Sequence, residues 1–299
     1  MDKERIYNIH KASLVGKLDL LIDKPEETID STLKALWFAA SGYPRSVEEA
    51  DKLQLPDLTD QQEIILADLI QQRLTNTPLA HITHRKSFMG IELLSDKRAL
   101  IPRKETEILG WKALELSQRI TKEKQEVKVI DVCCGAGNLG LALAFFNRNT
   151  VVWVSDLSEE AVELTRENIS FLNLNDRVKV HRSDLFSVFE SDEYYGKIDL
   201  IICNPPYISS AKVPKMALEI TDNEPALAFD GGMLGTKIIL KLIGEAPRFL
   251  IKGGWVVFEI GVGQGPFIMQ LCERSEFFDK VESVTDNSGN IRVILARKI

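Results

Sequence analysis

The tetrapeptide Asn-Pro-Pro-Tyr at residues 204–207 combines residue types that could hold a flat, polar group. It follows the apolar residues 201–203, and two adjacent prolines cannot continue a central strand or a helix interior. The side-chain oxygen of Asn204 and the backbone carbonyl of Pro205 could accept both hydrogens of an amide or amino group. Tyr207 could stack on such a group. The sequence therefore predicts catalytic roles for Asn204, Pro205 and Tyr207, with Pro206 in the substrate-binding set.

Two acceptors of this kind suit the transfer of a methyl group from a sulfonium to nitrogen. The lone pair of an amide or exocyclic amino nitrogen is delocalised, and gripping both hydrogens pulls the nitrogen toward tetrahedral geometry. Rigid prolines would hold the carbonyl in place, so the chemistry depends on positioning and electrostatics. No Asp or Glu adjoins the tetrapeptide, which is consistent with loss of the proton after transfer. The alternative is a strand-ending turn with a packing tyrosine.

A second set of polar and glycine residues follows earlier β-branched runs and could bind a nucleoside. Gly135 and Gly137 lack a Cβ, so their backbone could come close to a ligand. Asp156 lies 25 residues after Asp131 and could accept both hydroxyls of a ribose. Asp184 could accept from an adenine amino group. The predicted cofactor-binding residues are Asp131, Cys133, Cys134, Gly135, Ala136, Gly137, Asp156, Leu157, Asp184, Leu185 and Asn204.

The segment 131–144 is expected to lack both the Walker lysine and the third glycine of the dinucleotide fingerprint, which argues against a cradle for a pyrophosphate. A sulfonium nucleoside carries no phosphate, which favours S-adenosylmethionine over ATP or NAD as the cofactor. Each feature alone has a simpler explanation, since Asp156 could cap a helix and Asp184 could belong to a turn. Their order at successive strand ends, completed by the tetrapeptide, favours a nucleoside pocket beside a polar site.

Seven β-branched runs must position these residues, from "VKVID" at residue 127 to "IRVILARK" at residue 291. The connections after the first, second, fourth and fifth runs are long enough for helices. This alternation predicts an α/β fold, with a Rossmann-like, seven-stranded and mostly parallel sheet covered on both faces. The short "NSGN" connection before the last run predicts a hairpin and an antiparallel last strand. A helix is expected to begin near Asn138.

The residues before this predicted sheet differ from it in their pattern of apolar residues. Residues 1–76 are predicted to form a helical domain, residues 77–100 a β-hairpin linker, and residues 101–299 the third part, with a helix opening behind Pro102. One helix is expected to start at Asp30/Ser31. A second is expected to start with an Asp60–Glu63 capping box and to carry an apolar stripe. The stripe residues are Ile64, Ile65, Leu69 and Ile70.

Composition excludes several classes of protein. The 299 residues are 44% hydrophobic and 27% charged, as in a soluble globular protein, and the net charge of -7 argues against binding of bulk nucleic acid. The four cysteines lack C-x-x-C spacing and the four histidines are scattered, so neither a metal site nor a disulfide is expected. No signal-peptide region or transmembrane-length run is found. These features predict a cytoplasmic protein without a membrane partner, and we expect a monomer.

Three segments resemble those of a known family. Asn-Pro-Pro-Tyr after a fourth strand is typical of amino-methyltransferases. The segment "PLAHITHRKSFMGIELLSDKRALIPRKETEIL" (78–109) resembles the corresponding part of release-factor glutamine methyltransferases of the HemK/PrmC type. Residues 223–265 and the ending "SGNIRVILARK" are also similar to that family.

This resemblance implies a class I methyltransferase domain that uses S-adenosylmethionine, preceded by a helical domain that docks the substrate. The implied substrate is the glutamine of the Gly-Gly-Gln loop of a peptide chain release factor. Arg103, in the segment that matches the family's Pro-Arg-x-Glu-Thr-Glu, is implied to bind substrate in an interdomain cleft. Cys133 departs from the family, which has glycine there. By its length, the stretch 209–226 could close over the substrate, and a surface loop is the alternative.

Other functions fit the tetrapeptide equally well. A ribosomal-protein glutamine or the amino group of a nucleic-acid base could be gripped in the same way, although stable nucleic-acid binding is not expected. A non-catalytic binding module that kept the fold is the alternative from a different class. Only the segments that flank the tetrapeptide favour glutamine of a release factor.

Overall fold

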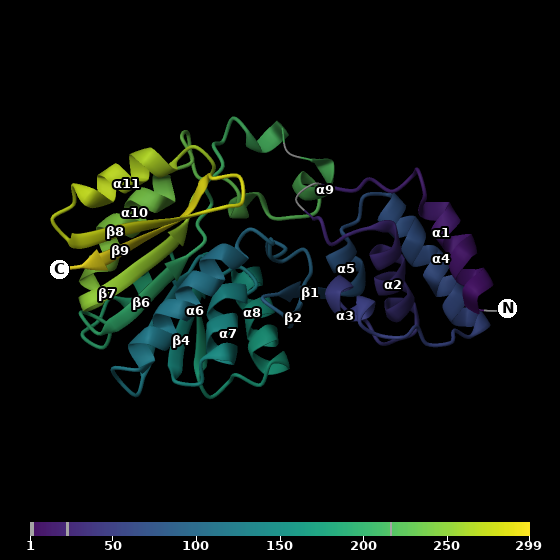
Figure 1. Cartoon of the computed structure of the whole chain (residues 1–299), viewed down its shortest axis with the longest axis horizontal. Helices are drawn as coiled ribbons and strands as arrows, with labels where there is room; N and C mark the ends of the chain where they lie inside the picture. Colours follow the sequence, from purple (N-terminus) through teal and green to yellow (C-terminus); the bar gives the residue numbers. More distant parts are fainter. Residues whose placement is uncertain (1–2, 22–23, 216) are drawn as a thin grey trace. The chain divides into compact units, whose positions relative to one another are not determined.

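The computed structural model describes residues 3–21, 24–215 and 217–299, which form two compact units (Figure 1). The first unit is Met1–Lys104 together with Met216–Glu224, and the second is Glu105–Lys215 together with Pro225–Ile299. The chain therefore leaves the second unit after the tetrapeptide and contributes a short segment to the first. Within the described residues, no helix combines the length and apolar character that a bilayer crossing requires.

The first unit is a helical bundle with a two-stranded hairpin, and Trp37, Leu33, Leu36 and Leu66 are among its fully buried side chains. Its helices are α1 (Lys3–Leu14), α2 (Ile29–Ala40), α3 (Val47–Asp51), α4 (Asp60–Leu74), α5 (Leu79–Thr83) and α9 (Leu218–Thr221), and its strands are β1 (Arg85–Phe88) and β2 (Ile91–Leu94). The strands pair antiparallel around Met89 and Gly90, as the sequence predicts.

The caps of α2 and α4 differ from the sequence prediction. Both helices have a threonine N-cap in a capping box, Thr28 with Ser31 and Thr59 with Gln62. The start expected at Asp30/Ser31 and the Asp60–Glu63 capping box are therefore wrong, although α4 does begin at Asp60. The threonine hydroxyl accepts from the N3 backbone N–H in each case, which favours the earlier residue as the cap.

The expected apolar stripe on α4 is also wrong in part. Ile70 is buried, but Ile64 and Ile65 are exposed, and Leu66 takes the core position instead. The buried face also includes Arg73 near the end of α4. A purely apolar pattern could not identify this face, because a charged residue belongs to it.

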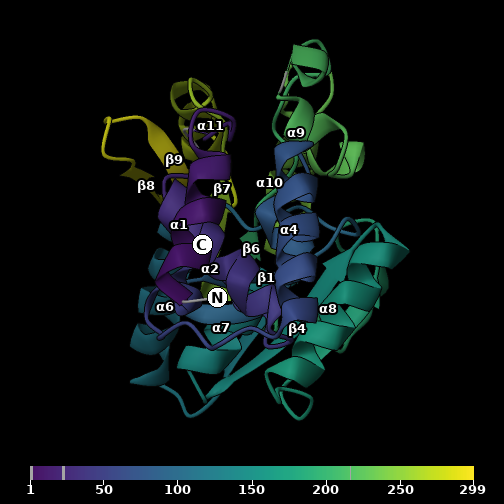
Figure 2. The same ribbon diagram turned by 90° about the vertical axis from the view of Figure 1, so that its right-hand side faces the viewer.

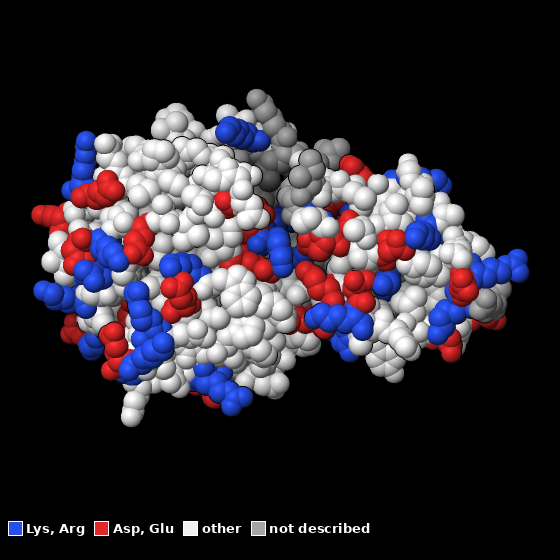
Figure 3. All heavy atoms as spheres, viewed as in Figure 1, with Lys and Arg blue, Asp and Glu red and all other residues white. Residues whose placement is uncertain are grey.

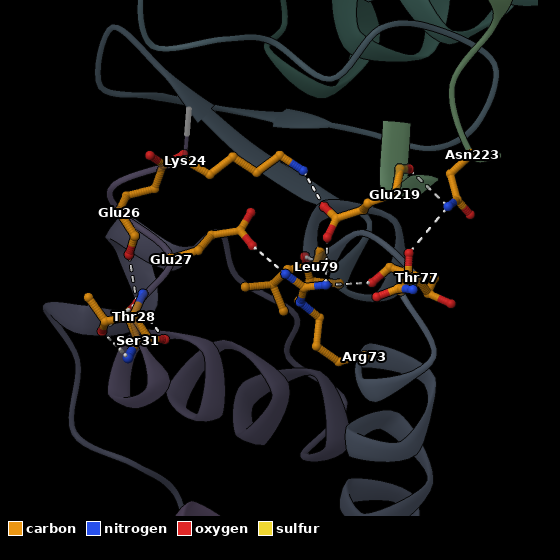
Figure 4. A network of polar contacts seen from close by, with 12 residues as sticks. Lys24, Glu26, Glu27, Thr28, Ser31, Arg73, Thr77, Leu79, Glu219 and Asn223 are labelled. Atoms are coloured by element: carbon orange, nitrogen blue, oxygen red, sulfur yellow. Dashed lines mark hydrogen bonds and ion pairs between the residues drawn. The ribbon is translucent and has the colours of Figure 1, made fainter. Parts of the chain in front are cut away.

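Arg73 belongs to a buried ionic cluster that holds the returning segment 217–224 within the first unit (Figure 4). Its Nη1 lies 2.9 Å from Oε2 of Glu219, and its Nη2 lies 3.1 Å from Oε2 of Glu27. Lys24 also pairs with Glu219. The side chains of Lys24, Arg73 and Glu219 are at most 5% exposed. Both cations therefore depend on Glu219 for charge compensation.

Glu224 makes a second attachment in the same segment. Its Oε2 accepts from the backbone N–H of Ile101 at 2.9 Å, and its Oε1 lies 2.6 Å from Nη2 of Arg103. The Glu224 side chain is fully buried. The stretch 209–226 is thus not a structureless loop: it contains the 3-10 turn Val213–Lys215 and α9, and a second 3-10 turn, Ala226–Ala228, begins at its end, while residue 216 lies outside the described residues. Its closure over a substrate stays a prediction.

The second unit is built on a seven-stranded sheet with the order β5-β4-β3-β6-β7-β9-β8. All strands are parallel except β9, which pairs antiparallel with β7 and β8. The strands are β3 (Val127–Val132), β4 (Thr150–Asp156), β5 (Val178–Arg182), β6 (Ile198–Cys203), β7 (Leu250–Glu259), β8 (Phe278–Thr285) and β9 (Ile291–Lys298). The predicted α/β fold and its antiparallel last strand are confirmed.

Helices cover both faces of this sheet. In Figure 1, α10 and α11 lie above β6 and β7, and α6 and α7 lie below them; Figure 2 again shows α6 and α7 below the two strands. The helices are α6 (Glu107–Thr121), α7 (Asn138–Phe146), α8 (Glu159–Phe171), α10 (Lys237–Glu245) and α11 (Gly265–Glu273). The helix expected near Asn138 is confirmed. The helix expected behind Pro102 begins later, at Glu107.

Candidate functional site

The register of three neighbouring strands brings the predicted site residues to one edge of the sheet. Val132, the last residue of β3, pairs with Ser155 on β4 and with Cys203 on β6. The residue that directly follows each of these three in the chain is a predicted site residue: Cys133, Asp156 and Asn204. The carboxyl ends of parallel strands are where α/β folds bind ligands. The glycine loop, the acidic residue and the tetrapeptide therefore meet at such an edge.

The glycine loop is tied to Asp156. The carboxylate oxygen Oδ2 of Asp156 accepts from the Gly135 N–H at 2.9 Å, and Oδ1 accepts from the Ser158 N–H at the same distance. A Cβ on Gly135 would meet no atom within 4 Å, so the backbone there is open to an approaching ligand. Burial raises the pKa of Asp156, and the hydrogen bonds to its carboxylate oppose that shift.

Gly137 is required for a different reason. It has a φ of +84°, and a Cβ there would lie 2.9 Å from Cδ1 of Leu141 and from Cγ2 of Thr165. Gly137 is the N-cap of α7, so this residue lets the chain turn from the loop into the helix.

A third glycine, Gly140, was overlooked in the sequence. It stands three residues after Gly137 and completes the spacing Gly-x-Gly-x-x-Gly. A Cβ on Gly140 would lie 2.5 Å from Cγ1 of Val154, so its absence allows α7 to pack closely against β4. The expected absence of this third glycine is therefore wrong, and the glycine spacing alone does not separate a sulfonium nucleoside from a dinucleotide. The complete glycine spacing can be read directly from the sequence.

Cys133 has a φ of +59°, in the left-handed region that favours glycine. Its backbone conformation explains why a glycine suits this position. The side chain is partly buried against the core cluster that includes Cys203, and burial, followed by the neighbouring Cys133, raises the pKa of the Cys203 thiol. Cys134 is buried, with its N–H donating to the Ser155 carbonyl at 3.0 Å and its sulfur 3.8 Å from Oγ1 of Thr165. Both cysteines thus shape the loop.

Asp131 is fully buried beneath this loop. Its Oδ2 accepts from the Gly140 N–H at 2.8 Å, and its Oδ1 has no hydrogen-bond partner among the described residues. Burial raises the pKa of Asp131 to about 8. The side chain therefore supports the start of α7 as a neutral acid at pH 7, and its contact with a cofactor stays a prediction.

Replacing Asp131 by asparagine should remove part of the pH dependence of stability. The folded-state pKa lies above the unfolded value, so the wild-type contribution is complete below pH 4 and is lost as the pH rises through about 8. Asparagine does not ionise and can still accept from Gly140. Relative to wild type, Asp131→Asn should gain stability with rising pH, by about 1 kcal/mol per unit between pH 5 and 8. Urea unfolding across this range measures the difference, and parallel curves would contradict it.

The remaining predicted cofactor residues fall at or near the same edge. Ala136 and Leu185 are buried, whereas Leu157 is exposed. Asp184 is exposed and pairs with Nζ of Lys241 at 2.8 Å. Its proposed bond to an adenine amino group would compete with this ion pair. Arg103, predicted to bind substrate, pairs with Glu224 in the first unit, and its contact with a substrate stays a prediction.

The tetrapeptide directly follows β6 and carries the two expected acceptors, whose role in binding a substrate stays a prediction. Asn204 is half-buried, and its Nδ2 donates to Oγ1 of Thr106 at 3.2 Å. Among the described residues, neither Oδ1 of Asn204 nor the carbonyl of Pro205 accepts a hydrogen bond. Pro205 is buried, and Pro206 packs against Gly231, where a Cβ would lie 2.5 Å from the Pro206 carbonyl oxygen. Two acceptors are therefore available for a substrate.

Tyr207 is fixed by residues that the sequence analysis missed. Its hydroxyl donates to Oε1 of Glu259 at 2.8 Å, and Nη2 of Arg292 lies 3.2 Å from the same oxygen. Burial, followed by the charge of Glu259, raises the pKa of Tyr207 well above its usual range, so the phenol keeps its proton. A carboxylate thus adjoins the tetrapeptide in space, although none does in the sequence. In the sequence, the feature that could have pointed to Glu259 as a site residue is its position at the end of a strand-like run.

Comparisons with known proteins agree with this geometry. Residues 113–236 match the family model "Methyltransferase small domain". The chain is 34% identical over 229 residues to the release factor glutamine methyltransferase of Clostridium acetobutylicum, covering 77% of this chain and 78% of that protein. It is 31% identical to the protein of the same name from Thermodesulfovibrio yellowstonii, covering 84% and 89%.

Solved structures share the fold at low sequence identity. The human methyltransferase 10 domain containing protein is 16% identical, with a TM-score of 0.51 and coverage of 69% of this chain and 88% of that chain. The N-terminal domain of human METTL16, solved in complex with SAH, is 16% identical, with a TM-score of 0.50 and coverage of 77% and 82%.

Proposed function

Because the chain belongs to the release factor glutamine methyltransferase family, we propose that it methylates the side-chain amide nitrogen of a protein glutamine, namely that of the Gly-Gly-Gln loop of a peptide chain release factor. Membership of this family of enzymes sets aside the non-catalytic binding module. The observation that carries the proposal is the pair of unengaged acceptors, Oδ1 of Asn204 and the Pro205 carbonyl, beside the glycine loop. A cytoplasmic, monomeric state stays a prediction.

The residues of the edge fit S-adenosylmethionine as the methyl donor. The open backbone at Gly135 can lie against the ligand, and the Asp156 carboxylate can accept from its ribose hydroxyls. No Walker lysine is present for a phosphate group. When bound, S-adenosylmethionine supplies an electrophilic methyl group on its sulfonium.

The tetrapeptide would hold the glutamine amide for attack. Asn204 and Pro205 each accept one amide N–H, which directs the nitrogen lone pair toward the methyl carbon. The amide nitrogen would take up the methyl group that the sulfonium donor gives up, and it would lose its extra proton afterwards. Tyr207 keeps its proton and packs beside the amide, while Glu259 and Arg292 hold the ring in place.

Charge distribution supports a protein substrate over bulk nucleic acid. On the face shown in Figure 3, lysine and arginine side chains alternate with aspartate and glutamate over both units. The whole chain carries a net charge of -7. Binding along a phosphate backbone needs clustered cations.

A methyl-transfer assay tests the substrate. The protein is incubated with isotopically labelled S-adenosylmethionine and a purified release factor, and the factor is digested for mass spectrometry. We expect the label on the glutamine of the Gly-Gly-Gln loop, and none on a factor in which that glutamine is alanine. No label, while a control methyltransferase modifies the same factor, would overturn the substrate. Label on a ribosomal protein or on RNA instead would establish one of the alternatives.

A further inference from the structure

Gln264 holds the backbone at the end of the tetrapeptide. It is the N-cap residue of α11, but its side chain bonds to residues outside that helix. Its Nε2 lies 3.2 Å from the carbonyl oxygen of Tyr207 and 3.1 Å from that of Gly235. Its Oε1 accepts from the backbone N–H of Gly261 at 2.8 Å. One amide group thus connects the tetrapeptide, the loop at Gly235 and the connection after β7.

These partners allow the Gln264 amide only one orientation. A backbone carbonyl only accepts and a backbone N–H only donates, so Nε2 must face the carbonyls and Oε1 must face Gly261. The two hydrogens of Nε2 suffice for Tyr207 and Gly235, and the carbonyl oxygen of Leu234 is farther away, at 3.4 Å. The direction of donation to Tyr207 therefore follows from backbone groups alone.

The peptide group between Tyr207 and Ile208 is consequently held on both sides. Its carbonyl accepts from Gln264, and its N–H, which belongs to Ile208, donates to the Phe229 carbonyl at 3.0 Å. The two prolines of the tetrapeptide have no backbone N–H, so their own amides cannot anchor the chain. The peptide group that follows them is therefore a backbone anchor of the tetrapeptide.

Two glycines bring a neighbouring loop close enough for this arrangement. A Cβ on Gly235 would lie 2.1 Å from the Tyr207 carbonyl oxygen, and one on Gly231 would lie 2.5 Å from the Pro206 carbonyl oxygen. The carbonyls of Pro206 and Tyr207 thus both pack against this loop. The Pro205 carbonyl accepts no hydrogen bond among the described residues, so it is the one left for a substrate.

We propose that Gln264 is a positioning residue for methyl transfer: by holding the Tyr207 carbonyl, it fixes the backbone of the tetrapeptide and so aims the Pro205 carbonyl at the substrate amide. In this role Gln264 contacts neither the substrate nor the cofactor. The inference rests on the proposed function, because it concerns the acceptor that the reaction needs. Tyr207 is then held twice, through its hydroxyl by Glu259 and through its carbonyl by Gln264. This order is present before a substrate binds.

Matched glutamine variants test the role. Gln264→Met keeps the length of the side chain and loses its hydrogen bonds, and should lower kcat about 10- to 100-fold. KM and the affinity for S-adenosylmethionine should stay within about threefold of wild type. Gln270→Met makes the same change at an exposed position of α11 and should leave kcat unchanged. Equal kcat for Gln264→Met and wild type would overturn the proposal, as would equal losses of rate and cofactor affinity.

Gln264→Glu gives a readout that depends on the donated proton. Its carboxylate keeps an acceptor for Gly261 but sets a negative oxygen against the Tyr207 carbonyl, so kcat at about pH 8 should fall at least as far as in Gln264→Met. Protonation of the introduced carboxyl restores a donor, so the rate relative to wild type should rise at least about threefold between about pH 8 and 5.5. Glu259 and Arg292, which face Tyr207 from β7 and β9, are present in every variant. Gln264→Met should show a flat ratio, and a flat ratio for Gln264→Glu would contradict the proposal.

Gly235→Ala disturbs the same carbonyl from its other side. The added Cβ would displace the Tyr207 carbonyl without removing a hydrogen-bonding side chain, and should lower kcat at least about tenfold. Gly289→Ala is the matched control, because Gly289 also has a positive φ, of +80°, and a Cβ there would meet no atom within 4 Å. Combining Gly235→Ala with Gln264→Met should give a kcat little below that of the slower single variant, because both changes release one carbonyl. Multiplicative losses would show independent roles and would overturn the proposal.

Amide hydrogen exchange in the free protein distinguishes this proposal from the proposed function. The Ile208 N–H belongs to the peptide group that Gln264 holds, so it should exchange at least about tenfold faster in Gln264→Met than in wild type or Gln270→Met. Unchanged exchange would overturn the positioning role even if the release factor is methylated. Faster exchange, together with failure of the wild-type protein to methylate the factor, would overturn the proposed function alone.

Discussion

Replacing Asn204 by alanine lowers the rate of methyl transfer by about 10²–10³-fold and leaves cofactor affinity within about tenfold of wild type. The reason is that Oδ1 of Asn204 is one of two acceptors that hold the substrate amide, and alanine has none. The hydrogen bond that ties Gly135 to Asp156, in the expected cofactor part of the edge, does not involve Asn204, whose side chain bonds to Thr106 instead. Cofactor affinity should therefore change little. Single-turnover kinetics with the release factor and calorimetry with S-adenosylmethionine measure the two quantities.

Asn175→Ala provides the control for Asn204→Ala. Asn175 is an exposed asparagine of the second unit, and its removal should leave both rate and affinity at wild-type values. If Asn204→Ala instead weakened cofactor binding as much as it lowered the rate, Asn204 would be a cofactor contact and not a substrate acceptor.

Replacing Glu219 by alanine destabilises the first unit by about 3–5 kcal/mol, because it leaves buried cations without their partner. Lys24 loses its ion pair with Glu219, and Arg73 keeps its ion pair with Glu27. The loss should be visible in urea unfolding followed by the fluorescence of Trp37, the single tryptophan among residues 1–104, in a protein whose other tryptophans are replaced by phenylalanine.

Asp222→Ala is the matched control for Glu219→Ala, because Asp222 is an exposed acidic residue in the same segment. It should change the free energy of unfolding by less than about 0.5 kcal/mol. Glu219→Ala values as small as those of Asp222→Ala would mean that the two cations find water or other partners, and that the cluster does not hold the segment.

The sheet and its ligand edge could be predicted because their signals are local. Each strand is a short β-branched run, and each edge residue directly follows one, so Asp156 and Asn204 could be placed from sequence alone. Gly140 was also visible as part of a spacing and was simply missed. Local signals failed where two neighbours compete, as at Thr28 and Asp30, since either residue type can cap a helix.

Residues that support the site could not be predicted in the same way. Thr106, Glu259 and Arg292 meet the tetrapeptide from distant parts of the chain, and each has an ordinary surface residue type. The burial of Arg73 could not be predicted either, because a charged residue on a helix is normally solvated. Only the three-dimensional structure shows which long-range partners such side chains have.

The packing of residues 217–224 within the first unit also limits how the protein can be divided. A fragment that ends at Lys104 would lack Glu219 and Glu224, and so would retain Lys24, Arg73 and Arg103 without those counterions. Such a fragment is an incomplete fold and not an exchangeable module. A synthetic peptide with the sequence of the missing segment should complete it in trans, as in split-protein complementation.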